Sequence, residues 1–96
     1  MFIQGKKIRF IGIGGANMSA LAVFLHEFGA IVSGSDAKSG EETEKLAALG
    51  IPVTIGVDDK KVEDVDCVVY SSAIRNDNPE LEKARELHIE TLERHE

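Results

Sequence analysis

Short apolar runs along the chain alternate with longer stretches in which apolar residues recur every three or four positions. Runs of the first kind predict buried β-strands, and the second spacing predicts amphipathic helices. The predicted strands are residues 7–13, 30–35, 51–56, 67–73 and 89–92. Strands that alternate with helices are typical of a mostly parallel sheet with helices on both faces. The pattern therefore predicts one three-layer α/β domain over residues 1–96, with about five strands and no linker or internal repeat.

Three helices are predicted between these strands. The first begins near Asn17 and is stopped by Gly29. Ser39 has capping-box spacing before the second helix, and Asn78 with Pro79 is typical of the start of the third. Residues 58–66 are expected to form an acidic loop with a weak signal for a helical turn. The positions expected to face the core are Met18, Leu21, Ala22, Leu25, Phe28, Leu46, Leu49, Leu81, Ala84 and Leu87.

The first predicted strand runs into a glycine-rich turn, "GIGGAN" (residues 12–17), which leads into the first helix. Gly12 permits a tight turn, and Gly14 lets the backbone approach a ligand without an intervening side chain. The free N–H groups and the dipole at a helix start favour a bound phosphate. Asn17 stands where the dinucleotide-binding pattern has its third glycine, and it can cap a helix or adopt left-handed backbone. A turn whose glycines serve only packing is the alternative.

Asp36 follows the second predicted strand, nineteen residues after Asn17. Dinucleotide-binding proteins place near there an acidic residue that accepts the ribose hydroxyls. A turn or helix-capping aspartate is the alternative interpretation. These residues predict a Rossmann-like nucleotide-binding domain without choosing between NAD and another nucleotide. No Lys or Arg lies between Arg9 and Lys38, so backbone donors, Ser19 and the helix dipole would hold the anion. We therefore expect modest, salt-sensitive affinity.

Composition narrows the possible partners. The net charge is −6, residues 1–50 are neutral, and the whole acidic excess lies in residues 51–96. A nucleic-acid partner normally requires a basic face, so none is expected. No apolar run approaches the roughly 20 residues that span a bilayer, and the single cysteine cannot form an internal disulfide. We expect a cytoplasmic protein with no membrane partner. The three histidines lack metal-ligand spacing, so no metal site is predicted.

Four segments in order, "IRFIGIGGANMSALA", "VSGSD", "ETEKLAALGI" and "VVYSSAIRNDNPELEKARELHIETLERHE", resemble the N-terminal domain of the Mur ligase family. The resemblance covers the chain from about Lys7 to Glu96. "SSAI" followed by "DNPE" is far more specific than the glycine turn, and it separates the chain from a dehydrogenase. The segments look most similar to the alanine-adding members, and members that add a preformed peptide to the same nucleotide are the closest alternative.

The resemblance implies a three-domain cytoplasmic ligase of peptidoglycan synthesis, in which this first domain holds the UDP part of UDP-N-acetylmuramic acid. The remaining domains would bind ATP, Mg²⁺ and the amino acid. The chain has no P-loop sequence, so these 96 residues are expected to bind no cofactor, to supply no catalytic residue and to be inactive alone. The UDP-binding residues implied by the resemblance are Gly12, Gly14, Gly15, Ala16, Asn17, Met18, Ser19, Asp36, Ser71, Ser72 and Ala73.

The chain departs from the family pattern at two positions. The family usually has glycine at Asn17, and it often has histidine at Val57. An NAD-binding domain of an oxidoreductase and a regulatory nucleotide sensor remain the alternatives from other functional classes.

Overall fold

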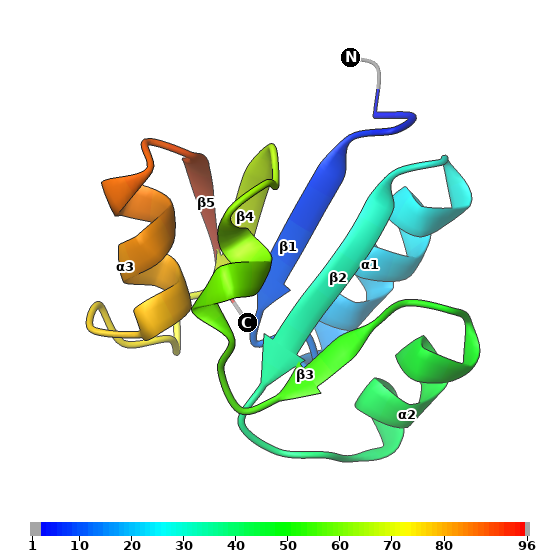
Figure 1. The fold of residues 1–96 in the computed structure, drawn as a ribbon. Helices are drawn as coiled ribbons and strands as arrows, with labels where there is room; N and C mark the ends of the chain where they lie inside the picture. Colours follow the sequence, from blue (N-terminus) through cyan, green and yellow to red (C-terminus); the bar gives the residue numbers. More distant parts are fainter. Residues whose placement is uncertain (1–2, 96) are drawn as a thin grey trace.

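The computed structural model describes residues 3–95, which form one five-stranded parallel sheet with three α-helices (Figure 1). The strand order is β3-β2-β1-β4-β5, and every neighbouring pair is parallel. This order confirms the predicted α/β, Rossmann-like class. The elements are β1 Lys7–Ile11, α1 Ala16–Glu27, β2 Ile31–Asp36, α2 Glu41–Ala48, β3 Val53–Ile55, the 3₁₀ turn η1 Asp59–Val62, β4 Cys67–Ser71, α3 Pro79–Glu86 and β5 Glu90–Arg94.

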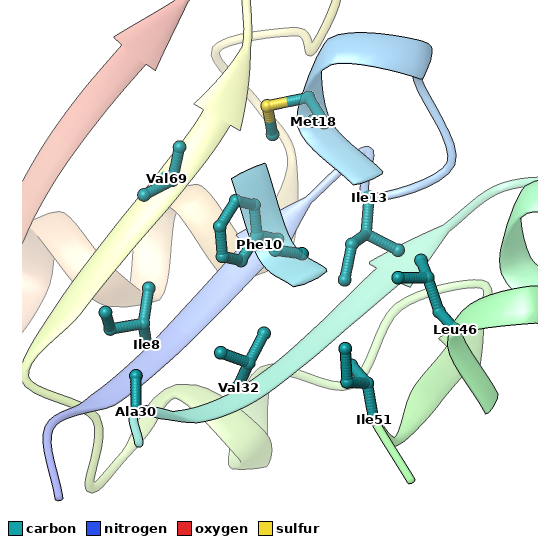
Figure 2. Packing of buried hydrophobic residues seen from close by; sticks show 10 residues of the cluster. Ile8, Phe10, Ile13, Met18, Ala30, Val32, Leu46, Ile51 and Val69 are labelled. Carbon is teal, nitrogen blue, oxygen red and sulfur yellow. The ribbon is translucent and has the colours of Figure 1, made fainter. Parts of the chain in front are cut away.

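Side chains that alternate along β1 enter two separate apolar clusters, one on each face of the sheet. Ile8 and Phe10 pack on the face covered by α1 and α2, and Figure 2 shows Phe10 in the middle of that cluster. Ile11 points to the opposite face, where it packs with residues of η1 and α3. In Figure 1, α1 and α3 accordingly lie on opposite sides of the sheet. Burial of each large apolar side chain contributes about 1.5–3 kcal/mol to this core.

The first strand ends two residues earlier than the apolar run predicts. Gly12 adopts a φ of 84°, and the N–H groups of Gly12 and Ile13 both donate to the carbonyl oxygen of Ser35, at 2.8 and 3.0 Å. A positive φ turns the chain away from the extended path of a strand. Ile13 is therefore a fully buried core residue of the turn.

Three apolar residues predicted to face the core are exposed instead. Phe28, Leu49 and Leu87 are 60%, 51% and 41% exposed. Each is the C-cap residue of its helix, in the order α1, α2 and α3. At a C-cap the chain leaves the helical path, so the inward apolar stripe ends three residues earlier, at Leu25, Leu46 and Ala84.

The predicted helix starts are right for α3 and wrong by one residue for α2. The Asn78 side chain accepts hydrogen bonds from the N–H groups of Glu80 and Leu81, and Pro79 opens α3 as predicted. At α2 the N-cap is Gly40 rather than Ser39, because the Thr43 hydroxyl takes over the capping. Its Oγ1 accepts from the Gly40 N–H at 2.8 Å and donates to the Gly40 carbonyl at 2.9 Å.

The weak helical signal in residues 58–66 is confirmed by the 3₁₀ turn η1. None of the helices in residues 3–95 combines the length and the apolar character that crossing a membrane requires.

Candidate functional site

The candidate site lies at the carboxyl ends of the strands, next to the neighbouring strands β1 and β4. From β1 the chain moves outward to β2 and β3, and it then crosses to β4 on the other side of β1. Connections that leave a sheet in opposite directions open a crevice at this switch point, where doubly wound domains bind their ligands. The arrowheads of β1, β2 and β3 point to this edge in Figure 1.

Two adjoining hollows occupy this edge. One of about 200 Å³ lies over the ends of β1 to β4, and one of about 260 Å³ lies between Gly14 and the start of α2. Asp36 lines both hollows. The residues around the first are Ile11, Gly12, Ser35, Asp36, Ala37, Gly56, Val57, Ile74 and Asn78. A third and more apolar hollow, of about 240 Å³, lies at the opposite, amino end of β1, β4 and β5. Its lining is mostly apolar with Lys6, Asp66 and Glu90 beside it, and none of its lining residues belongs to the glycine turn.

The glycine turn presents backbone groups to this edge without a side-chain cap. Gly15 is the N-cap of α1, and as glycine it offers the helix no side-chain oxygen. The first N–H groups of a helix have no intrahelical acceptor, so those of Ala16 and Asn17 point out of the helix start. Together with the positive end of the helix dipole, they form a surface suited to an anion.

Asn17 does not play the part predicted for it. It is the second residue of α1 rather than its cap, and it is exposed. Among the described residues, His88 is the only non-glycine with a positive φ, so Asn17 does not use left-handed backbone either. The helix start is shaped by Gly15, and the Asn17 side chain is free to face a ligand.

Both glycines that the fingerprint singles out are also required for packing. A Cβ on Gly14 would lie 2.8 Å from Asp36 Oδ2, and one on Gly12 would lie 3.3 Å from Ser71 Cβ. Gly12 therefore brings the end of β1 against the end of β4, while Gly14 lets the turn approach β2. Packing alone can therefore explain why both positions are glycine. It does not explain why the N–H groups at the start of α1 have no side-chain cap.

Asp36 joins the glycine turn to the loop that leads into α2. Its Oδ2 accepts a hydrogen bond from the Gly14 N–H at 2.8 Å, and its Oδ1 accepts one from the Lys38 N–H at 3.1 Å. The second bond is the local turn role considered as an alternative. The contact of Asp36 with a nucleotide stays a prediction, and such a contact would have to share a carboxylate already holding two amides.

Two other predicted residues point away from the open edge. The Met18 side chain is fully buried in the cluster beneath α1. The Ser19 hydroxyl is 3.1 Å from both the Ala16 carbonyl and Glu42 Oε2, and Ser19 is buried. A ligand at this edge could therefore contact Met18 and Ser19 only through their backbone. To contact the Ser19 hydroxyl it would have to displace Glu42.

Residues 71–73 lie at the end of β4, on the other side of the switch point. Ser71 is buried, and its Oγ accepts a hydrogen bond from the Ala73 N–H at 3.2 Å. The Ser72 N–H donates to the Arg94 carbonyl at 2.8 Å. The structure thus brings Ser71 next to Gly12, while Ser72 and Ala73 are exposed at the same edge.

A cation to which the sequence assigned no role borders the glycine turn. Lys38 lines the same hollow as Gly14 and Asp36, so a positive side chain does border the anion surface. Its position two residues after Asp36 was the only signal in the sequence.

On the loop after β4, Arg75 is paired with Asp77 Oδ1 at 3.1 Å, and this hydrogen bond lowers the pKa of the Asp77 carboxyl.

Comparison with known proteins supplies the family. The model of a protein family described as "Mur ligase family, catalytic domain" matches residues 7–96. The chain belongs to the Mur ligase family. The UDP-N-acetylmuramate--L-alanine ligase of Clostridium kluyveri is 51% identical to it over 96 residues, which are 99% of this chain and 21% of that protein. This Mur ligase chain therefore spans about a fifth of the length of such relatives.

Solved Mur ligases share the fold of this chain. The UDP-N-acetylmuramate-alanine ligase MurC of Thermotoga maritima superposes with a TM-score of 0.88 at 39% identity, covering 92% of this chain and 20% of that one. The UDP-N-acetylmuramate:L-alanyl-gamma-D-glutamyl-meso-diaminopimelate ligase of Neisseria meningitides superposes with a TM-score of 0.82 at 33% identity, covering 93% and 28%. The resemblance carried by "SSAI" and "DNPE" is thereby confirmed at the level of the family.

Proposed function

We propose that residues 1–96 are the UDP-binding domain of a UDP-N-acetylmuramate–L-alanine ligase. The observation that carries the proposal is the uncapped start of α1 at the switch point of the sheet, in a chain whose similar relatives are named for that activity. The ligand is the UDP part of UDP-N-acetylmuramic acid, with its diphosphate at the glycine turn.

The binding energy has to come from more than the helix start. A helix dipole contributes about 0.3–2 kcal/mol, whereas micromolar affinity corresponds to about 8 kcal/mol. The hollow beside Asp36 and Val57 offers apolar and polar contacts to the uridine, and Lys38 borders the diphosphate. We expect the amides to orient the nucleotide and these side chains to supply most of the affinity.

Ligation itself needs groups that these residues lack. The sequence contains no Gly-x-x-x-x-Gly-Lys-Ser/Thr motif, so ATP and Mg²⁺ would bind to other domains of the same cytoplasmic ligase. ATP would transfer its terminal phosphoryl group to the substrate carboxylate and leave as ADP, and the amine of alanine would then attack the acyl phosphate and displace phosphate. The role of this chain is to hold the substrate by its nucleotide, so the chain alone should not catalyse the reaction.

A ligase that joins a preformed peptide to the same sugar nucleotide is the second candidate. The similarity to the Neisseria meningitides ligase favours it, because that protein is also named for UDP-N-acetylmuramate. Both candidates require the same UDP site in this chain.

Calorimetric titration with UDP, UDP-N-acetylmuramic acid and NAD tests the proposal. We expect both uridine ligands to bind and NAD to bind at least 10-fold more weakly. Gly14→Ala should weaken UDP binding at least 10-fold, because the added methyl group meets Asp36 at the anion surface. Glu86→Ala is the control, since Glu86 is exposed at the last residue of α3, away from the glycine turn. Tight binding of NAD without binding of UDP would refute the proposal.

A further inference from the structure

A fully buried ion pair lies beneath the sheet, on the face covered by α3. Arg9 of β1 and Glu80 of α3 are 1% and 0% exposed. Arg9 Nε lies 3.0 Å from Glu80 Oε1, and Arg9 Nη2 lies 3.2 Å from Glu80 Oε2. These two contacts form a bidentate pair, which fixes the relative orientation of the two side chains.

Stability alone does not explain this pair. Removing two charges from water is costly, and well-packed apolar side chains in their place are often as stable or more so. The other ion pairs in residues 3–95 are much more accessible, with side chains between 25% and 83% exposed. A buried pair that apolar side chains of similar size could replace without loss of stability points to a role in positioning.

The contacts of the pair reach both walls of the 200 Å³ hollow. Glu80 Oε2 accepts a hydrogen bond from the Asp58 N–H at 2.9 Å, directly after Gly56 and Val57 of one wall. The main-chain N–H of Glu80 donates to Asn78 Oδ1, the N-cap of α3, which belongs to the other wall. The Glu80 carboxylate therefore ties the first turn of α3, next to one wall, to the segment 56–58 of the other.

Arg9 connects this link to the sheet. Its Nη2 also donates to Thr54 Oγ1 of β3 at 3.2 Å, so the guanidinium spans from β1 toward the edge strand. Arg9 lies three residues before Gly12 on the strand that leads into the glycine turn. The network thus joins β1, β3, the segment 56–58 and the start of α3.

We propose that Arg9 and Glu80 are positioning residues for nucleotide binding: their buried pair holds the segments 56–58 and 78–80 at the spacing that the nucleotide requires. The inference rests on the proposed function for its ligand, while the positioning itself is measurable without any ligand. Neither side chain touches the nucleotide.

The test replaces the pair by apolar side chains of similar size, Arg9→Met with Glu80→Leu. The folded double variant should bind UDP at least 10-fold more weakly, at temperatures far below its unfolding midpoint. Without ligand, amide hydrogen exchange at Gly56 and Asn78 should accelerate at least 10-fold. These amides donate to Asp36 O and Arg75 O within the two walls. Exchange in β1 and β4 should stay unchanged.

The matched control is Lys83→Met with Glu63→Gln, which removes a more exposed pair between α3 and the end of η1. It should leave the affinity for UDP and the amide hydrogen exchange at Gly56 and Asn78 unchanged. A folded double variant with normal UDP affinity and normal exchange at Gly56 and Asn78 would overturn the proposal. A purely structural role would instead lower the unfolding midpoint and leave the binding of the folded fraction intact.

The test remains informative if the double variant does not fold or if the unmodified chain binds no UDP. If the double variant does not fold, Thr54→Val removes one contact of Arg9 and should weaken UDP binding about 3-fold and accelerate exchange at Gly56. Unchanged values for both would overturn the proposal. If the unmodified chain binds no UDP, the proposed function fails, and the exchange measurements still decide whether the pair positions the walls.

Discussion

Replacing Glu80 by alanine is expected to lower the free energy of unfolding by about 3–5 kcal/mol. The substitution leaves the Arg9 guanidinium buried without its counter-charge, and it removes the acceptor of the Asp58 N–H. An uncompensated buried charge is far more costly than the loss of a whole pair. A domain of this size has a total stability of about 5–15 kcal/mol, so the substitution should remove a large share of it.

Urea denaturation followed by circular dichroism measures this loss. Glu82→Ala is the control, because Glu82 is exposed on the same helix and should change the free energy of unfolding by less than about 0.5 kcal/mol. The account of the buried pair would be wrong if Glu80→Ala lost no more than its control. Arg9→Met combined with Glu80→Leu should recover most of the stability.

Gly34→Ala is expected to lower the free energy of unfolding by about 2–3 kcal/mol. Gly34 lies in β2, and a Cβ there would be 2.5 Å from Ile13 Cδ1, 2.8 Å from Ile13 Cβ and 2.9 Å from the Phe10 carbonyl oxygen. A rotamer change of Ile13 relieves only the first of these contacts. The other two require the glycine turn or β1 to move.

The same denaturation experiment applies, with Ser33→Ala as the control on the neighbouring position of the strand. The control should lose less than about 1 kcal/mol, since it removes atoms rather than adding them. Because Ile13 belongs to the turn, Gly34→Ala should also shift the amide resonances of residues 12–15. Normal stability and an unshifted turn would show that the packing between β2 and the turn is looser than described.

The strands could be predicted from the sequence because a parallel sheet covered on both faces requires continuous apolar runs. Residues 67–71 follow this rule closely. The ends of the elements could not be predicted as well, because single backbone angles set them. Gly12 ends β1 by its positive φ, and the C-cap residues Phe28 and Leu49 turn outward although they continue the apolar spacing.

The candidate site was predictable where it depends on local sequence. The glycine turn and Asp36 each follow a strand, and parallel strands bring their carboxyl ends to one edge, where Gly14 and Asp36 meet. The Arg9–Glu80 pair was not predictable, because 71 residues separate its members. Only the placement of β4 beside β1 and of α3 beneath them brings the two charges together.

The central claim is that the backbone amides of the first βα turn hold the diphosphate of a uridine nucleotide. Titration of the ¹⁵N-labelled chain with UDP, followed by amide chemical shifts, tests it most directly. We expect the largest shifts at Gly14, Gly15, Ala16 and Asn17, saturating together with smaller shifts at Asp36 and Val57. Saturable UDP binding that shifts another edge of the sheet and leaves residues 14–17 unmoved would contradict the claim.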